Sequence, residues 1–147
     1  MGLGISSLVH AAETPDGCND NCKVGDKGIT YSTAQTFFYA CPSMELSAYT
    51  NGVLGLLSMT YQISGKTPTL SKSTGDPEYE GDTRNTIDNW RKQAHVASFD
   101  QAVEQCVKGR DKLPVTLLKV PADADDLLVS GDDNRPFWMP KGFLIKQ

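Results

Sequence analysis

Residues 43–63, SMELSAYTNGVLGLLSMTYQI, form the most apolar stretch of the chain. Ser43 is a suitable helix N-cap, and apolar residues follow it on nearly every side of a helical projection. A helix that is apolar almost all round is typical of the middle of a bundle, so we expect this one to lie there. The spacing of Ala48, Gly52 and Gly55 predicts a close crossing with a neighbouring helix, although a break at the Asn-Gly dipeptide would instead give two short helices.

Further helices are predicted on both sides of this stretch. Residues 36–40 favour a short helix that a following proline interrupts. An amphipathic helix begins at Asp82 or Thr83. The residues that recur along its inner stripe at three- and four-residue steps are Ile87, Trp90, Arg91, Ala94 and Ala97. A Ser-x-x-Gln capping box at Ser98 begins another helix, which Gly109 ends in the left-handed conformation.

Strands are predicted only after that last helix. Residues 115–120, 127–129 and 143–145 are short apolar runs bounded by proline, glycine and aspartate, a pattern typical of strands. We therefore expect an α+β fold that is mostly helical. It would have a small helical core crosslinked by disulfides and a short antiparallel strand region near the C-terminus.

Length and charge limit the domain count and the partners. The 147 residues are enough for one domain, and we assign residues 13–147 to it, with a long polar loop at residues 64–82. The net charge is −4 and no basic block occurs, so we expect no nucleic-acid partner. No apolar run approaches the ~18 residues that would span a bilayer, so we expect no membrane span.

Four cysteines permit three disulfide pairings, among which sequence alone does not choose. We prefer a bridge from Cys41 to Cys106, at the ends of two helices, and a local one from Cys18 to Cys22. A zinc site fits less well, because only Cys18 and Cys22 have a spacing suited to a metal. Free thiols are the third alternative.

The N-terminal residues suggest export. Residues 1–12 contain a short apolar run and the small-x-small sequence Val9-His10-Ala11, which is typical of a secretory cleavage site. We interpret them as the remnant of a signal peptide; the alternatives are a disordered N-terminus and myristoylation at Gly2. Because disulfides persist in oxidising compartments, we predict a periplasmic or secreted protein of bacterial origin.

Few residues could carry catalysis. His95 is the only histidine that remains once a signal peptide is removed, and no common catalytic or nucleotide-binding motif occurs. Acidic residues crowd two regions, which we interpret as solvated loops, with calcium binding and catalysis as alternatives. These residues are Asp76, Glu78, Glu80, Asp82, Asp123, Asp125, Asp126, Asp132 and Asp133. We single out no catalytic residue and expect neither a cofactor nor a metal ion.

Three segments are candidates for contact with a partner. The first is the tip between the first two cysteines, which could equally be a staple on the N-terminus, and the second is the polar loop at residues 64–82. The third is an aromatic segment flanked by prolines, which presents a large apolar area on a stiff backbone unless it folds back onto the core. The candidate binding residues are Asn19, Asp20, Asn21, Arg135, Phe137 and Trp138.

The predicted function is that of a small exported, disulfide-stabilised binding or interaction protein. An inhibitor, an immunity-type protein and an accessory subunit of an envelope assembly are examples, and the acidity of the chain would suit a basic partner protein. The alternative is a carboxylate-dependent hydrolase that acts on a cell-envelope polymer through Glu78, Glu80 or Asp82. A lipid-anchored cytosolic adaptor is a third possibility, which depends on acylation of Gly2.

Overall fold

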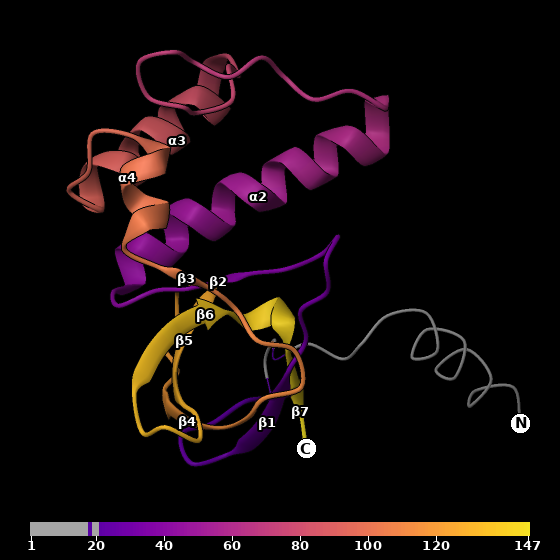
Figure 1. Cartoon of the computed structure of the whole chain (residues 1–147), viewed down its shortest axis with the longest axis vertical. Helices are drawn as coiled ribbons and strands as arrows, with labels where there is room; N and C mark the ends of the chain where they lie inside the picture. The colour runs from indigo at the N-terminus through magenta and orange to yellow at the C-terminus, as the bar shows by residue number, and fades with distance from the viewer. Residues whose placement is uncertain (1–17, 19–20) are drawn as a thin grey trace, which may run out of the picture.

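The computed structural model describes Cys18 and residues 21–147, and Figure 1 shows helices on one side of a curled sheet. Of the described residues, 34% are helical and 23% lie in strands, and they form three α-helices and a five-stranded antiparallel sheet. The prediction of a mostly helical fold is therefore wrong. The predicted signal-peptide remnant, residues 1–12, lies outside the described residues.

The sheet joins the two ends of the described chain. In order across the sheet, its strands are β6 (Pro136–Pro140), β5 (Asp126–Ser130), β4 (Pro114–Lys119), β1 (Lys27–Thr30) and β7 (Leu144–Lys146). Every neighbouring pair is antiparallel. A short 3₁₀ helix, η1 (Lys141–Phe143), connects β6 to β7.

Two of these strands, β1 and β6, were not expected from the sequence. β1 has only four residues and obtains its hydrogen bonds from strands that lie far away along the chain. β6 begins and ends with proline, a residue that cannot donate a hydrogen bond to a neighbouring strand. β6 lies at an edge of the sheet, where proline is tolerated.

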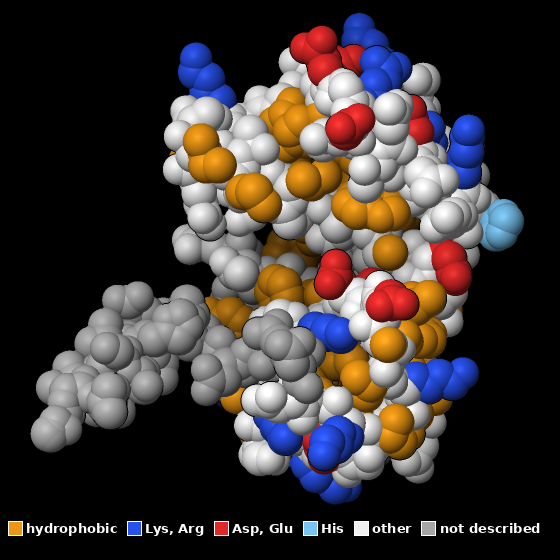
Figure 2. Space-filling model, turned by 180° about the vertical axis from the view of Figure 1, so that it is seen from behind, with side chains coloured by type: hydrophobic (Ala, Val, Ile, Leu, Met, Phe, Trp, Pro, Cys, Tyr) orange, Lys and Arg blue, Asp and Glu red, His pale blue; other side chains and the backbone are white. Residues whose placement is uncertain are grey.

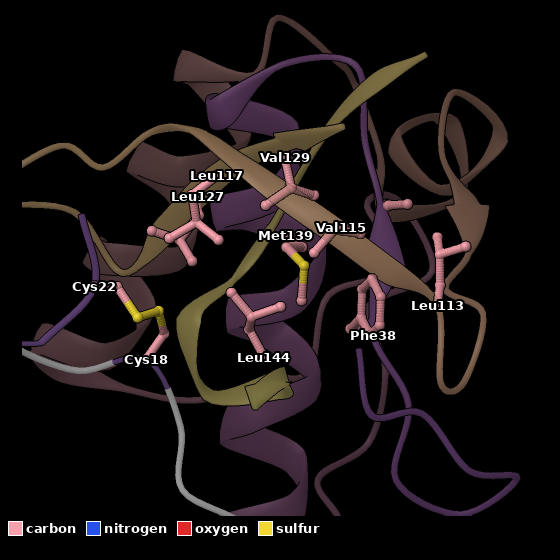
Figure 3. Packing of buried hydrophobic residues seen from close by; sticks show 11 residues of the cluster. Cys18, Cys22, Phe38, Leu113, Val115, Leu117, Leu127, Val129, Met139 and Leu144 are labelled. Carbon is pink, nitrogen blue, oxygen red and sulfur yellow. A yellow bond between two sulfur atoms is a disulfide. The ribbon is translucent and has the colours of Figure 1, made fainter. Parts of the chain in front are cut away.

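The larger hydrophobic core belongs to the sheet (Figure 3). Along β4, Val115 and Leu117 are buried and the residues next to them are more exposed, as the two-residue period of a strand requires. Burial of each such side chain contributes about 1.5–3 kcal/mol. The core consists of Cys18, Cys22, Phe38, Ala40, Leu113, Val115, Leu117, Leu127, Val129, Met139 and Leu144.

The helices form one insertion into this sheet protein. The chain leaves the sheet through β2 (Tyr39–Ala40) and returns through β3 (Val107–Lys108), and these two short strands pair antiparallel. The disulfide between Cys41 and Cys106, with Cα atoms 4.4 Å apart, closes the insertion at its base. A second disulfide joins Cys18 to Cys22, so the preferred pairing is the one that the structure contains.

The insertion contains α2 (Met44–Ser64), α3 (Gly81–Gln93) and α4 (Phe99–Glu104). Ser43 caps α2 as predicted, because its hydroxyl accepts a hydrogen bond of 3.1 Å from the backbone N–H of Leu46. The helix continues without a break through its Asn-Gly dipeptide. None of the described helices is long and apolar enough to cross a membrane.

The position of α2 differs from the prediction. Its buried hydrophobic residues, Leu46, Tyr49 and Val53, all lie in its N-terminal half. Beyond them the helix extends past α3 and α4 (Figure 1), and Tyr61 and Ile63 are 60% and 80% exposed. The expectation that α2 lies in the middle of a bundle is therefore wrong, because the insertion has too few helices to surround it.

Two local predictions around the base of the insertion are also wrong. The expected helix at residues 36–40 is instead an extended segment that ends in β2. Gly109 does not end a helix, because α4 stops at Glu104. The ring of Phe38 covers Gly109 so closely that a Cβ atom there would overlap it, and this close contact requires a glycine.

The long polar connection between α2 and α3 is held by Asp76, which is only 5% exposed. Its carboxylate accepts hydrogen bonds from the hydroxyl of Tyr49 and from the guanidinium of Arg91. Arg91 also donates a hydrogen bond of 3.0 Å to Asp88, one turn earlier on α3. Burial and the neighbouring Asp76 raise the pKa of Tyr49, so this phenol remains a donor.

Candidate functional site

Of the three predicted contact residues near the N-terminus, the structure describes only Asn21, which lies beside the sheet. Asn19 and Asp20 fall outside the described residues. Asn21 is exposed, and its backbone carbonyl accepts a hydrogen bond of 2.9 Å from Nζ of Lys146 on β7. The neighbouring Cys18–Cys22 disulfide is part of the sheet core, an arrangement that favours the staple over the contact loop.

The aromatic segment forms β6. Trp138 pairs with Cys41 through two backbone hydrogen bonds of 3.0 and 2.8 Å, which attach the sheet to the base of the insertion. Phe137 packs against the sheet core. Together with Arg135, it lines a pocket of about 270 Å³ next to β3. The structure thus brings Arg135 and Phe137 to one pocket.

The acidic residues named for catalysis do not converge. Glu78, Glu80 and Asp82 are exposed on the loop before α3 and on its first turn. His95 is exposed, two residues beyond the end of α3. In the described part of the chain, no group of three or more His, Cys, Asp or Glu residues could hold a metal ion.

Two adjoining pockets lie along α2. Figure 2 shows a hollow between the helices and the sheet, with hydrophobic side chains around it and acidic side chains beside it. We name the first the acidic pocket, which has a volume of about 440 Å³. We name the second the apolar groove, which has a volume of about 650 Å³. Asn51 lines both of them.

The acidic pocket is bounded by the N-terminal half of α2, the C-terminal end of α3 and the loop before β5. Its charged and aromatic lining consists of Glu45, Asp123, Asp125, Asp126 and Trp90. In the described residues, none of these four carboxylates forms an ion pair with a lysine or arginine. The pocket therefore offers a negative potential that the protein does not neutralise by direct pairing.

Asp126 is the buried member of this group and is only 5% exposed. Burial is the main cause that raises its pKa to about 6. The neighbouring Asp125 also raises it, and the hydroxyl of Ser47 and the charge of Lys141 act in the opposite direction. Ser47 donates a hydrogen bond of 2.6 Å from Oγ to Oδ1 of Asp126.

A chain of hydrogen bonds fixes the boundary between the two pockets. Asn51 accepts a hydrogen bond of 2.7 Å from the backbone N–H of Tyr39 and returns one of 3.0 Å to the carbonyl of Tyr39. Asn51 also donates to Oγ of Ser47 at 3.0 Å, and Ser47 in turn donates to Asp126. These bonds connect β2, α2 and β5, so the pocket walls are held in place before any ligand arrives.

The apolar groove lies along the C-terminal half of α2. Phe37 and Phe143 form part of its lining opposite the helix, and the side chains contributed by α2 include Leu54, Met59 and Tyr61. Met59 is 56% exposed. Large apolar side chains gathered around a groove are more typical of an interaction surface than single exposed ones.

Sequence reasoning missed the central residues of this site. The acids before β5 are conspicuous in the sequence, but their pattern predicts a solvated loop. The sequence pattern does not indicate a functional role for Ser47 or Asn51, because a polar residue within an apolar helix usually faces solvent. Trp90 belongs to the inner stripe of α3, a pattern that predicts core packing and does not distinguish a pocket wall.

A comparison of the chain with protein-family models, with curated proteins and with solved structures found no match.

Proposed function

We propose that this chain is a small exported protein that binds another protein through the apolar groove. The single observation that carries the proposal is the exposed apolar surface of α2. Met59 and Tyr61 remain more than half exposed while they line a groove of about 650 Å³. Leaving such side chains in water is unfavourable, and a partner that covers them would gain the free energy of their burial.

Two further features support the class of function. The disulfides Cys41–Cys106 and Cys18–Cys22 would persist in an oxidising compartment such as the periplasm or the extracellular space. The hydrogen bonds of Asn51 hold the N-terminal end of the groove, and a preorganised surface loses little entropy on binding. An inhibitor, an immunity-type protein or an accessory subunit of an envelope assembly would use such a surface.

The test starts with photo-crosslinking in the native host. A benzoylphenylalanine residue replaces Met59 or Tyr61 in the groove, and as a control it replaces Val24, which is 68% exposed and lies beside the sheet. We expect one protein to crosslink from both groove positions and not from the control. Absence of a crosslinked protein, or equal crosslinking from Val24, would overturn the proposal.

The identified partner is then purified and its affinity is measured. We expect Met59→Glu to weaken binding at least tenfold, because the variant places a charge in the groove. Ile63→Glu is the matched control, because Ile63 lies on the same helix and is 80% exposed but does not line the groove. Equal effects of the two variants would contradict the assignment of the groove as the binding surface.

A second candidate function is that of a carboxylate-dependent hydrolase. Its catalytic acid would be Asp126, and not Glu78, Glu80 or Asp82. The observation that favours it is the pKa of about 6 for a carboxyl group in a pocket with three other carboxylates. Such a group can act as a general acid near neutral pH. The test is release of soluble fragments from dye-labelled peptidoglycan, which Asp126→Asn should abolish. No release by the unaltered protein would exclude this activity on peptidoglycan.

A further inference from the structure

The acidic pocket contains an unused hydrogen-bond acceptor. Oδ1 of Asp126 accepts a hydrogen bond from Ser47, and no partner is present for Oδ2 among the described residues. Every fully buried side-chain nitrogen or oxygen of the described residues has a hydrogen-bond partner. Oδ2 is therefore not fully enclosed by the protein, although Asp126 as a whole is only 5% exposed. Asp126 lines the acidic pocket. A ligand that donates a hydrogen bond to Oδ2 would complete the coordination of this carboxylate.

Trp90 gives the same pocket an aromatic wall. A Cβ atom added to Gly52 would lie 2.6 Å from the indole ring, so the ring packs directly on the backbone of α2. Trp90 lines this pocket together with the four carboxylates. An aromatic ring near carboxylates is a combination that recognises an organic cation, because both the ring quadrupole and the negative charges attract it. The volume of about 440 Å³ accommodates a side chain.

We propose that the acidic pocket is a subsite for one arginine or lysine side chain of the partner protein, which it holds between Trp90 and Asp126. This inference rests on the proposed function, because it concerns the same partner. Asn51 lines both pockets, so one segment of a partner can place apolar residues in the groove and its cationic residue in the pocket. Charge pairing with an acidic pocket also gives specificity for a basic partner.

The protonation of Asp126 should be linked to binding. The charged groups around this carboxyl are Glu45 on α2, Asp123 and Asp125 on the loop before β5, and Lys141 on η1. A cation prefers the ionised form of Asp126, so the affinity should increase as the pH rises through about 6. A ligand bound only by apolar contacts would show no such dependence.

The test uses N-acetyl-arginine amide as a probe and N-acetyl-citrulline amide as its neutral control, which has nearly the same shape. The readout is the indole N–H resonance of each of the two tryptophans in NMR titrations of the full chain. We expect the arginine probe to shift the resonance of Trp90 with a Kd on the order of 1 mM, while that of Trp138 stays unchanged. The citrulline probe should produce no saturable shift.

Two variants then test whether the cation of the probe binds next to Asp126. Asp126→Asn should weaken binding of the arginine probe at least fivefold, and Asp133→Asn, on an exposed turn, should leave it unchanged. Binding of both probes alike, a shift confined to Trp138, or no effect of Asp126→Asn would overturn the subsite. The outcome is separable from the proposed function, because the photo-crosslinks in the groove do not depend on Asp126.

Discussion

The indole ring of Trp90 on α3 lies against Gly52 on α2, with no room for a side chain between them: a Cβ atom at position 52 would be 2.6 Å from the ring. Gly55, one turn further along α2, has nothing within 4 Å of the corresponding position. The small residues predict the close approach of a neighbouring helix, but the space at Gly52 is filled by the side chain of Trp90, and Gly55 contacts nothing.

This difference predicts opposite effects of the same substitution at two glycines. Gly55→Ala should stabilise the protein by about 1 kcal/mol, because alanine favours the helix and meets no neighbour. Gly52→Ala should destabilise it, because the ring of Trp90 must move. The measurement is the free energy of unfolding in urea. In a Trp90→Ala background, Gly52→Ala should become stabilising, and an unchanged sign there would show that the ring is not the cause.

The raised pKa of Asp126 predicts how stability depends on pH. The folded state holds this proton up to about pH 6, whereas the unfolded carboxyl has an ordinary pKa of 3.8. The folded state therefore binds more protons between these values, and the contribution of Asp126 to stability falls as the pH rises through this range. The total loss is about 3 kcal/mol.

Asp126→Asn tests this relationship. The variant keeps an oxygen that accepts the hydrogen bond of Ser47 but cannot ionise. It should therefore be more stable than the unaltered protein at pH 7 and gain little at pH 4, as measured by urea unfolding at both values. A stability difference that is the same at pH 4 and pH 7 would contradict the raised pKa.

The two disulfides should contribute unequally to stability. The sequence separation is 65 for Cys41–Cys106 and 4 for Cys18–Cys22. In the chain-entropy model, replacing the first pair with alanine costs about 4 kcal/mol and replacing the second costs about 2 kcal/mol. Urea unfolding of the two double variants measures the difference. Equal losses would show that the local packing around the sulfur atoms outweighs loop closure.

The buried ion pair between Asp76 and Arg91 predicts that a single substitution strongly lowers the free energy of unfolding. Arg91→Met should destabilise the protein by about 3 kcal/mol, because it leaves a buried carboxylate without its cation. The double variant Asp76→Asn with Arg91→Met should recover part of this loss, since no unpaired charge remains. Thermal or urea unfolding of the single and double variants provides the comparison, and no recovery would argue against the ion pair as the cause.

Local signals made the starts of α2 and α4 predictable. The hydroxyls of Ser43 and Ser98 cap these helices as expected, although the side chain of Gln101 accepts its hydrogen bond from the backbone N–H of Ala97 and not from that of Ser98. The sheet depends on distant partners instead. Lys27 of β1 pairs with Thr116 of β4, and a four-residue strand carries no pattern that identifies a partner so far along the chain.

The candidate site was less predictable than the fold for the same reason. The run of acids that ends at Asp126 is visible in the sequence, but its burial depends on Ser47, which is 79 residues away. Asn51 obtains its role from the backbone of Tyr39 in β2. Only the position of Trp90 on the inner side of α3 followed from periodicity, and periodicity does not show that a packed ring also borders a pocket.

The Cys41–Cys106 bridge also determines how the molecule would respond to mechanical tension applied at its two ends. The pulling force would run through the sheet strands and across the sulfur–sulfur bond. It would not stretch the chain between the two cysteines, which have a sequence separation of 65 and enclose α2, α3 and α4. At about 3.4 Å per residue, roughly 220 Å of chain is excluded from the stretched length. A protein tethered at both termini would thus lose its sheet under load while its helices stayed within a closed covalent ring.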